Sequence, residues 1–236
     1  EARNALNGPH MRDIIAALRG LDAAPDVRVV VVRGAGRGFC AGADIGEFLG
    51  RGVMAARDYL AAVPEMFEQL HRMSKPVIAQ VHGFALAGGC GLAVGCDLGI
   101  AAEDAVFGLP EINIGVWAYN VMAPLLRTVP RKVLLELLMT GERIDGREAA
   151  RIGMVNRAVP AEQLEGAVRE LAEKLAAKSA ATMKLGRQAF YTMADMDYLK
   201  SFQYAREMLV LNTLTEDGQE GPRAFKEKRP PRWMHR

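Results

Sequence analysis

Apolar residues along the first hundred positions form two kinds of pattern, one typical of helices and one typical of strands. Helix-spaced apolar residues run from about Met11 to Leu21, and a polar helical region is predicted at 46–72. Largely apolar runs of strand length occur at 27–32, 75–81 and 97–102. The run at 27–32, in which Arg28 is the one polar residue, predicts a strand that is buried on both faces. Because predicted strands alternate with helices, the pattern favours an α/β crossover architecture.

From about residue 116 onward, the pattern becomes mainly helical. Helical segments are predicted at 120–139, 146–152, 161–178, 179–194 and 197–216, with a brief strand at 154–159. A short buried helix is also predicted earlier, at 89–96. No internal repeat or low-complexity linker interrupts the chain. We therefore expect a core formed by residues 1–190 and a C-terminal helical region formed by residues 191–236.

The composition restricts the partners and the compartment. Of 236 residues, 50% are hydrophobic and 6% are aromatic, which predicts an aliphatic core. The net charge of +2 argues against nucleic acid or a membrane as the main partner. Three cysteines, an odd number, argue against a disulfide framework and favour the cytoplasm. Cys40 and Cys90 could be nucleophiles, but free cysteines are usually inert packing residues, which is the interpretation we favour.

Several common catalytic motifs do not occur in the chain. Gly34-x-Gly36-x-Gly38 follows a predicted strand, but Phe39 stands where the dinucleotide-binding fingerprint needs its third glycine. Neither a Gly-x4-Gly-Lys-Ser/Thr phosphate loop nor a Gly-x-Ser-x-Gly turn is present. The four histidines are scattered without metal-ligand spacing. The sequence therefore predicts neither a metal site nor a separate cofactor.

Three turns rich in small residues follow the predicted strands. They are Phe-Cys-Ala-Gly-Ala-Asp at 39–44, Phe-Ala-Leu-Ala-Gly-Gly-Cys-Gly at 84–91 and Phe-Gly-Leu-Pro-Glu-Ile-Asn-Ile-Gly at 107–115. Small residues let a ligand approach the backbone, so that two N–H groups can reach one oxygen. Gly88 also begins a predicted helix, where free N–H groups and the dipole favour negative charge. Alternatively, these glycines only allow a helix to pack closely on a sheet.

In order and spacing, the three turns resemble the crotonase (enoyl-CoA hydratase/isomerase) superfamily. The similarity extends to Leu-Met-Thr-Gly-Glu-Arg-Ile at 138–144, Gly-Met-Val-Asn at 153–156 and the ending at 224–229, so it covers nearly the whole chain. The resemblance implies an α/β fold, a crotonase-like spiral of ββα units followed by a C-terminal helical trimerisation region. It further implies a homotrimer, or a hexamer built as a dimer of trimers.

The resemblance also implies where an acyl-CoA substrate binds. The backbone N–H groups of Ala43 and Gly88 would form an oxyanion hole around the thioester oxygen. Coenzyme A would be part of the substrate, and no further cofactor is implied. The contacts implied for coenzyme A are Ala41, Asp44 and Ile45 near the adenine, with Phe225 and Lys228 from a neighbouring subunit.

Glu111 is the candidate acid–base residue. It follows Pro110 among apolar neighbours, where burial should raise the pKa of its carboxyl group toward neutrality. It also matches the second catalytic glutamate of the family. Hydratases of the family carry their other glutamate at the position of Gly91, and a glycine cannot ionise. The resemblance therefore implies double-bond isomerisation of an enoyl-CoA slightly ahead of hydration, and we expect Gly91→Glu to raise hydration.

Further alternatives remain at the level of the sequence. Gly91, Trp117 and Tyr119 are predicted to shape the acyl pocket, and Tyr119 could donate a proton. Packing in the core or at the rim explains both aromatic residues equally well. The chain could also be a homologue that binds acyl-CoA without catalysis, a reading that Gly91 supports. An RNA-binding side activity has little support from the near-neutral charge.

Overall fold

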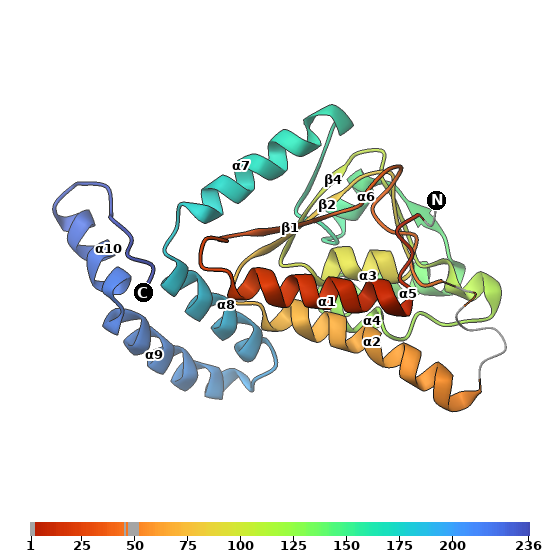
Figure 1. Ribbon diagram of the computed structural model, residues 1–236, viewed down its shortest axis with the longest axis horizontal. Helices are drawn as coiled ribbons and strands as arrows, with labels where there is room; N and C mark the ends of the chain where they lie inside the picture. The colour runs from red at the N-terminus through yellow and green to blue at the C-terminus, as the bar shows by residue number, and fades with distance from the viewer. Residues whose placement is uncertain (1–2, 45, 47–51) are drawn as a thin grey trace.

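The computed structural model describes residues 3–44, 46 and 52–236, and Figure 1 shows their arrangement. A parallel sheet of four strands has the order β1 (Val30–Arg33), β2 (Val77–Val81), β4 (Leu98–Ala102), β7 (Arg157–Val159). Helices connect these parallel strands along the chain. The α/β class predicted from the alternating pattern is therefore confirmed.

A second, smaller sheet lies where only turns were predicted. It consists of β3 (Phe84–Leu86), β5 (Val106–Gly108) and β6 (Arg143–Ile144), with β3 and β5 parallel. Each strand has two or three residues, which is too short to show a hydrophobic period in the sequence. The motifs at 84–91 and 107–115 thus each begin as a strand before they turn.

Strand β1 is less buried than its sequence predicts. Val31 is 38% exposed and Arg33 is exposed, so the expectation of burial on both faces at 27–32 was wrong. The reason is that the helices on this face of the sheet do not reach as far as its edge strand. α7 (Leu164–Ala176) packs against the central strands β2 and β4, which leaves one face of the edge strand β1 open to solvent. Strand β2, in contrast, is almost entirely buried.

Helices cover the sheet and extend beyond it. α1 (Gly8–Ala23) and α2 (Val53–Arg72) lie against each other, and α3 (Gly88–Gly95), which is buried except at its two ends, packs on β2 and β4. The middle of the chain adds the shorter helices η2 (Pro110–Ile114), α4 (Met122–Leu125), α5 (Arg131–Thr140), α6 (Gly146–Arg151) and η3 (Ala161–Gln163). No helix of the described ranges is long and apolar enough to cross a membrane.

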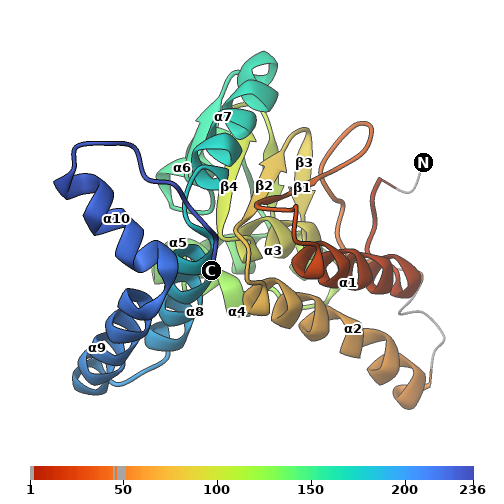
Figure 2. The same ribbon diagram turned by 60° about the vertical axis from the view of Figure 1, so that its left-hand side comes forward.

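Three C-terminal helices project from the core, as Figure 2 shows. They are α8 (Ala180–Ala194), α9 (Tyr198–Leu214) and α10 (Glu216–Lys226), of which α10 was not predicted. The pattern at 197–216 fits α9, but α10 contains two glycines and a proline, which weaken a helical signal. The predicted boundary at residue 190 falls inside α8, and the division into two regions stays a prediction.

A buried ion pair ties α8 to the core. The guanidinium of Arg187 lies 2.9 Å from the carboxylate of Asp97, and their side chains are only 6% and 14% exposed. The same guanidinium donates hydrogen bonds to the backbone oxygens of Leu70, His71 and Met73, at the end of α2. Because four separate groups share one cation, α8 is held at a fixed place on the core.

Tyr191→Phe should lower the free energy of unfolding by about 1.5–3 kcal/mol, the usual value for a hydrogen bond to a charged group. The Tyr191 hydroxyl donates to the Asp97 carboxylate at 2.5 Å, and phenylalanine keeps the ring but loses this bond. Urea unfolding at neutral pH measures the difference. Tyr198→Phe is the control, because Tyr198 is 75% exposed and should change stability by less than about 0.5 kcal/mol. Equal effects of both substitutions would contradict the prediction.

Candidate active site

The turn at 40–44 is fixed by hydrogen bonds on both sides. Leu6 N–H donates to the Gly42 carbonyl at 2.8 Å, and Leu86 N–H donates to the Cys40 carbonyl at 3.0 Å. Gly42 has φ +93°, a left-handed conformation that favours glycine. The turn therefore runs between the N-terminal segment and β3, with Ala43 at its end.

The turn at 86–89 holds a strained residue just before the helix. Ala87 has φ 51° and ψ −124°, which is uncommon for a residue with a side chain. Its N–H donates to the Gly108 carbonyl at 2.9 Å, and its own carbonyl accepts from Gly91 N–H at 3.1 Å. Such strain persists only where the surroundings enforce it, and it is concentrated at functional sites. The strain orients the N–H of Gly88, the first residue of α3.

The two turns touch each other. A Cβ atom added to Gly42 would lie 2.6 Å from the Ala87 Cβ and 3.1 Å from the Gly88 nitrogen. A Cβ atom added to Gly88 would lie 3.5 Å from the Ala43 nitrogen. Among the hydrogen bonds of the described residues, none has the Ala43 or Gly88 N–H as its donor. Two backbone N–H groups with no acceptor among the described residues therefore lie near each other.

Glu111 lies next to this pair of turns. It is the second residue of η2, which follows β5, and β5 ends at the carbonyl that binds Ala87. Burial raises the pKa of the Glu111 carboxyl group, as the apolar sequence around it predicted. Its Oε2 atom is buried and has no hydrogen-bond partner among the described residues. A buried carboxylate oxygen without a partner is costly for stability, so it is a candidate for contact with a ligand.

The predicted adenine contacts have different environments. Ala41 lines a cavity of about 210 Å³ together with Arg3, Gly83, Phe84, Leu86, Val106 and Arg143. Asp44 is exposed, and its carboxylate accepts a hydrogen bond from Gly46 N–H at 3.0 Å. Ile45 lies outside the described residues. Sequence reasoning missed Arg3 and Arg143, because they are distant along the chain and the tertiary structure alone brings them to one cavity.

Phe225 and Lys228 lie at the end of α10, far out on the C-terminal helices. Phe225 is 87% exposed, and Lys228 takes a left-handed conformation with φ 53°. Lys228 N–H binds the Phe225 carbonyl, and the next N–H binds the Ala224 carbonyl, the pattern that commonly ends a helix with glycine. Lysine in place of glycine costs stability here, which is consistent with a role for its side chain.

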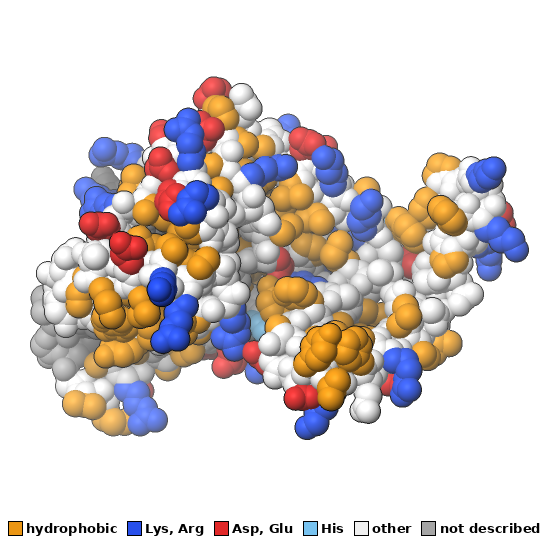
Figure 3. Space-filling model, turned by 180° about the vertical axis from the view of Figure 1, so that it is seen from behind, with side chains coloured by type: hydrophobic (Ala, Val, Ile, Leu, Met, Phe, Trp, Pro, Cys, Tyr) orange, Lys and Arg blue, Asp and Glu red, His pale blue; other side chains and the backbone are white. Residues whose placement is uncertain are grey.

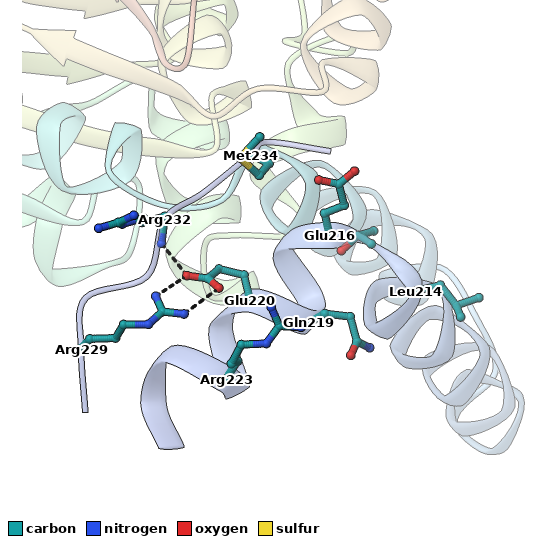
Figure 4. A pocket seen from close by; sticks show the side chains of 9 residues that line it. Leu214, Glu216, Gln219, Glu220, Arg223, Arg229, Arg232 and Met234 are labelled. Carbon is teal, nitrogen blue, oxygen red and sulfur yellow. Dashed lines mark hydrogen bonds and ion pairs between the residues drawn. The ribbon is translucent and has the colours of Figure 1, made fainter. Parts of the chain in front are cut away.

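A carboxylate clamp fixes the chain after this helix end. Figure 4 shows Glu220 between the guanidinium of Arg229, at 2.6 and 3.0 Å, and the backbone N–H of Arg232, at 2.8 Å. These donors lower the pKa of Glu220 to about 2. The clamp borders a cavity of about 640 Å³ between α10 and the C-terminal tail. The clamp thereby fixes the chain segment that directly follows Lys228.

The predicted acyl-pocket residues do not share one environment. Tyr119 is 70% exposed, and its role as a proton donor stays a prediction. Trp117 packs against the core, and its indole N–H lies 3.2 Å from the Met122 sulfur. Gly91 is buried on α3, one residue after Cys90. The structure therefore brings Gly91 close to the two turns and leaves Tyr119 in solvent.

All three thiols should be unreactive toward a disulfide reagent in the native protein at pH 8. Burial raises the pKa of Cys40 to about 11 and that of Cys90 to about 12, and it also raises the pKa of Cys96. The thiolate is the reactive form, so reaction needs unfolding first. Counting thiols with a chromogenic disulfide reagent should give none in buffer and three in urea. Fast reaction of one thiol in buffer would show that it is accessible and could be a nucleophile.

Comparison with known proteins places the chain among acyl-CoA enzymes. The family model for enoyl-CoA hydratase/isomerase matches residues 1–236. The rat protein "Enoyl-CoA hydratase domain-containing protein 3, mitochondrial" is 34% identical over 237 residues, covering 99% of this chain and 78% of its own length. These matches cover the same part of the chain as the motifs that resemble the crotonase superfamily.

Solved structures agree with the sequence matches. The crystal structure of an enoyl-CoA hydratase from Mycobacterium smegmatis has a TM-score of 0.95 at 33% identity, covering 98% of this chain and 91% of that chain. An enoyl-CoA hydratase from Bacillus anthracis has a TM-score of 0.93 at 32% identity, covering 100% of this chain and 92% of that chain. The fold expected from the resemblance is confirmed. The chain belongs to the enoyl-CoA hydratase/isomerase family, the crotonase superfamily.

Proposed function

We propose that this protein is an enoyl-CoA enzyme that uses the N–H groups of Ala43 and Gly88 as an oxyanion hole and Glu111 as its single acid–base residue. The main support is the contact between the two turns, which sets two free donors side by side. An acyl-CoA thioester is the substrate class of the family. The thioester oxygen would accept hydrogen bonds from both donors as negative charge develops on it.

Both reactions of enoyl thioesters considered below develop this negative charge on the thioester oxygen. A nucleophile that adds to C3 of a 2-enoyl thioester, or a base that removes a proton from C2 of a 3-enoyl thioester, generates an enolate whose oxygen carries the charge. Donors that are already in place stabilise this oxygen without reorganisation. A carboxyl group with a raised pKa both accepts and returns protons near neutral pH. Burial raises the pKa of Glu111 in this direction.

Hydration is the first candidate reaction, because the relatives with solved structures are named enoyl-CoA hydratases. Glu111 would take a proton from water while the water oxygen bonds to C3. It would then deliver that proton to C2 of the enolate, so that one water molecule is added. This ordering differs from the sequence analysis, which placed isomerisation slightly ahead.

Isomerisation is the second candidate, and one specific observation favours it. Gly91 offers no second ionisable group beside the oxyanion hole. A single carboxylate can move a proton from C2 to C4 of a 3-enoyl thioester, which gives the conjugated 2-enoyl product without water. In that reaction Glu111 would be both the base and the acid.

Mass spectrometry of the products from a panel of 2-enoyl and 3-enoyl thioesters separates the candidates. Hydration adds the mass of water to a 2-enoyl substrate. Isomerisation leaves the mass of a 3-enoyl substrate unchanged and creates the absorbance of the conjugated thioester. Binding of the thioesters without either product would instead indicate a homologue that has lost catalysis. Absence of both binding and turnover over the panel would overturn the proposal.

We also propose that the C-terminal helices mediate a homotrimer or a hexamer. Helix α9 has no buried residue within the chain. Large apolar side chains are exposed over this part of the molecule, on the right in Figure 3. They include Phe190, Tyr198, Leu199, Phe202, Leu209 and Leu214. In such an assembly Phe225 and Lys228 would contact coenzyme A in a neighbouring subunit. The cytoplasm stays the predicted compartment, although the rat relative carries a mitochondrial name.

A further inference from the structure

One face of α3 is made of glycines. Gly88, Gly91 and Gly95 are spaced by three and four residues, so they lie on the same side of the helix. Gly88 provides a donor of the proposed oxyanion hole. Gly91 therefore faces the same region one turn further along, where a longer side chain would approach the substrate.

Two apolar side chains already fill the space in front of Gly91. A Cβ atom added there would lie 2.6 Å from Val121 Cγ1, 2.8 Å from Val121 Cβ and 3.1 Å from Phe67 Cζ. The first two distances are shorter than real Cβ contacts allow, and Val121 is 4% exposed. A side chain at position 91 thus needs Val121 to move, and the expectation that Gly91→Glu alone would raise hydration overlooked this.

The wall that results is apolar. Cys90 precedes Gly91, and burial together with the nearby charge of Glu111 raises the pKa of its thiol, so it stays protonated. Burial raises the pKa of Glu111, and the hydrogen bond from its own backbone N–H opposes this rise. Position 91 on α3 therefore gives Glu111 no second carboxylate with which to share proton transfer.

We infer that Val121, supported by Phe67, determines reaction specificity by filling the space that a second acid–base side chain on α3 would occupy. This inference rests on the proposed function. Adding water needs one proton removed from water and one proton given to C2, and two carboxylates divide these tasks. With Val121 in place, Glu111 performs both steps alone, which limits the rate of hydration, the first candidate reaction.

A stability cycle tests the packing without any assay of activity. Gly91→Ala should lower the Tm by about 2–10 °C, because it overpacks a closed site. In the Val121→Gly background the same change should raise the Tm, since the space is open and alanine is the better helix former. Gly95→Ala is the matched control. A Cβ at Gly95 meets Phe67 at 3.1 Å and not Val121, so Val121→Gly should leave its effect unchanged.

An activity cycle tests the specificity. We expect the double variant Gly91→Glu/Val121→Gly to hydrate crotonyl-CoA at least about tenfold faster, in kcat/KM, than the wild type or either single variant. A well-positioned acid–base group contributes about 10²–10⁴-fold, so a tenfold gain already allows for imperfect placement of the new carboxylate. Equal hydration by Gly91→Glu alone would overturn the inference, and so would a folded double variant that binds crotonyl-CoA but shows no gain.

The two cycles keep the inference separate from the proposed function. If the double variant with glutamate does not fold, the Tm cycle decides: additive Tm shifts overturn the inference, and reversal of the Gly91→Ala effect supports it. If the wild type neither binds nor converts any enoyl-CoA, the proposed function fails. The Tm cycle would then still report whether Val121 closes the space at Gly91.

Discussion

Glu111→Gln should lower the turnover of an enoyl-CoA thioester by about 10²–10⁴-fold, the usual contribution of a general acid–base residue. Glutamine keeps the size and one carbonyl oxygen of the side chain, but it cannot exchange a proton. The affinity for the thioester should stay within about twofold, because the Ala43 and Gly88 donors are unchanged. Steady-state kinetics and isothermal titration with the unreactive saturated thioester measure the two quantities.

Glu162→Gln is the matched control for this substitution. Glu162 occupies the first turn of η3, as Glu111 does in η2, and each helix has a proline at its start, Pro160 and Pro110. Glu162 is exposed and lies on a helix that borders α7 instead of the two turns. Its substitution should leave turnover unchanged. If Glu111→Gln keeps full turnover, Glu111 has no part in the mechanism, whichever reaction is catalysed.

The same substitution should stabilise the protein at neutral pH. Because the folded-state pKa of Glu111 is raised, its contribution to stability is fully present below the unfolded pKa and is lost as the pH rises through the folded pKa. Glutamine cannot ionise, so the variant avoids this loss. The Tm difference between variant and wild type should be small near pH 4 and larger at pH 8. In the wild type, Glu111 acts as a base only when it is ionised. Turnover should therefore fall as the pH drops through the raised pKa of Glu111.

Gly42→Ala should lower turnover by about 10²–10³-fold, the cost of losing one oxyanion-hole donor. The new Cβ would lie 2.6 Å from the Ala87 Cβ and 2.8 Å from the Leu86 carbonyl oxygen, so the two turns must separate. Separation moves the Ala43 and Gly88 N–H groups apart. The left-handed φ at this position adds a backbone cost of about 1–2 kcal/mol. Turnover and Tm should be measured on the same preparation.

Gly36→Ala is the control for Gly42→Ala, because it has the cost of a left-handed backbone without the clash of the new Cβ atom. Gly36 also has a left-handed φ, of 71°, but a Cβ there meets nothing within 4 Å. This variant should show a similar backbone penalty in Tm and full turnover. A Gly42→Ala protein that folds and turns over normally would show that contact between the turns is not required for catalysis.

The sequence could single out the proposed site residues because they belong to continuous motifs. Ala43, Gly88 and Glu111 each lie in a short turn whose composition is unusual and whose spacing resembles one family. The apolar runs at 75–81 and 97–102 likewise correspond to β2 and β4, since buried central strands leave a strong hydrophobic signal. Local composition and period were sufficient for these features.

Other features depend on contacts between distant parts of the chain. The short strands of the second sheet have no period of their own, and the exposure of Val31 depends on how far α7 reaches. The cation that holds α8 pairs with a carboxylate ninety positions earlier. No window of the sequence contains both partners of such contacts.

The sequence by itself determined the α/β class, the family and the three turns that carry the proposed chemistry, because each depends on neighbouring residues. Only the tertiary structure decided that the turns at Gly42 and Ala87 touch, and that Val121 and Phe67 close the space at Gly91. A glycine in the sequence is equally compatible with an open pocket and with a filled one. Which of the two exists depends on the side chains that other elements bring to it, because protein interiors are packed too closely to leave space for an added side chain.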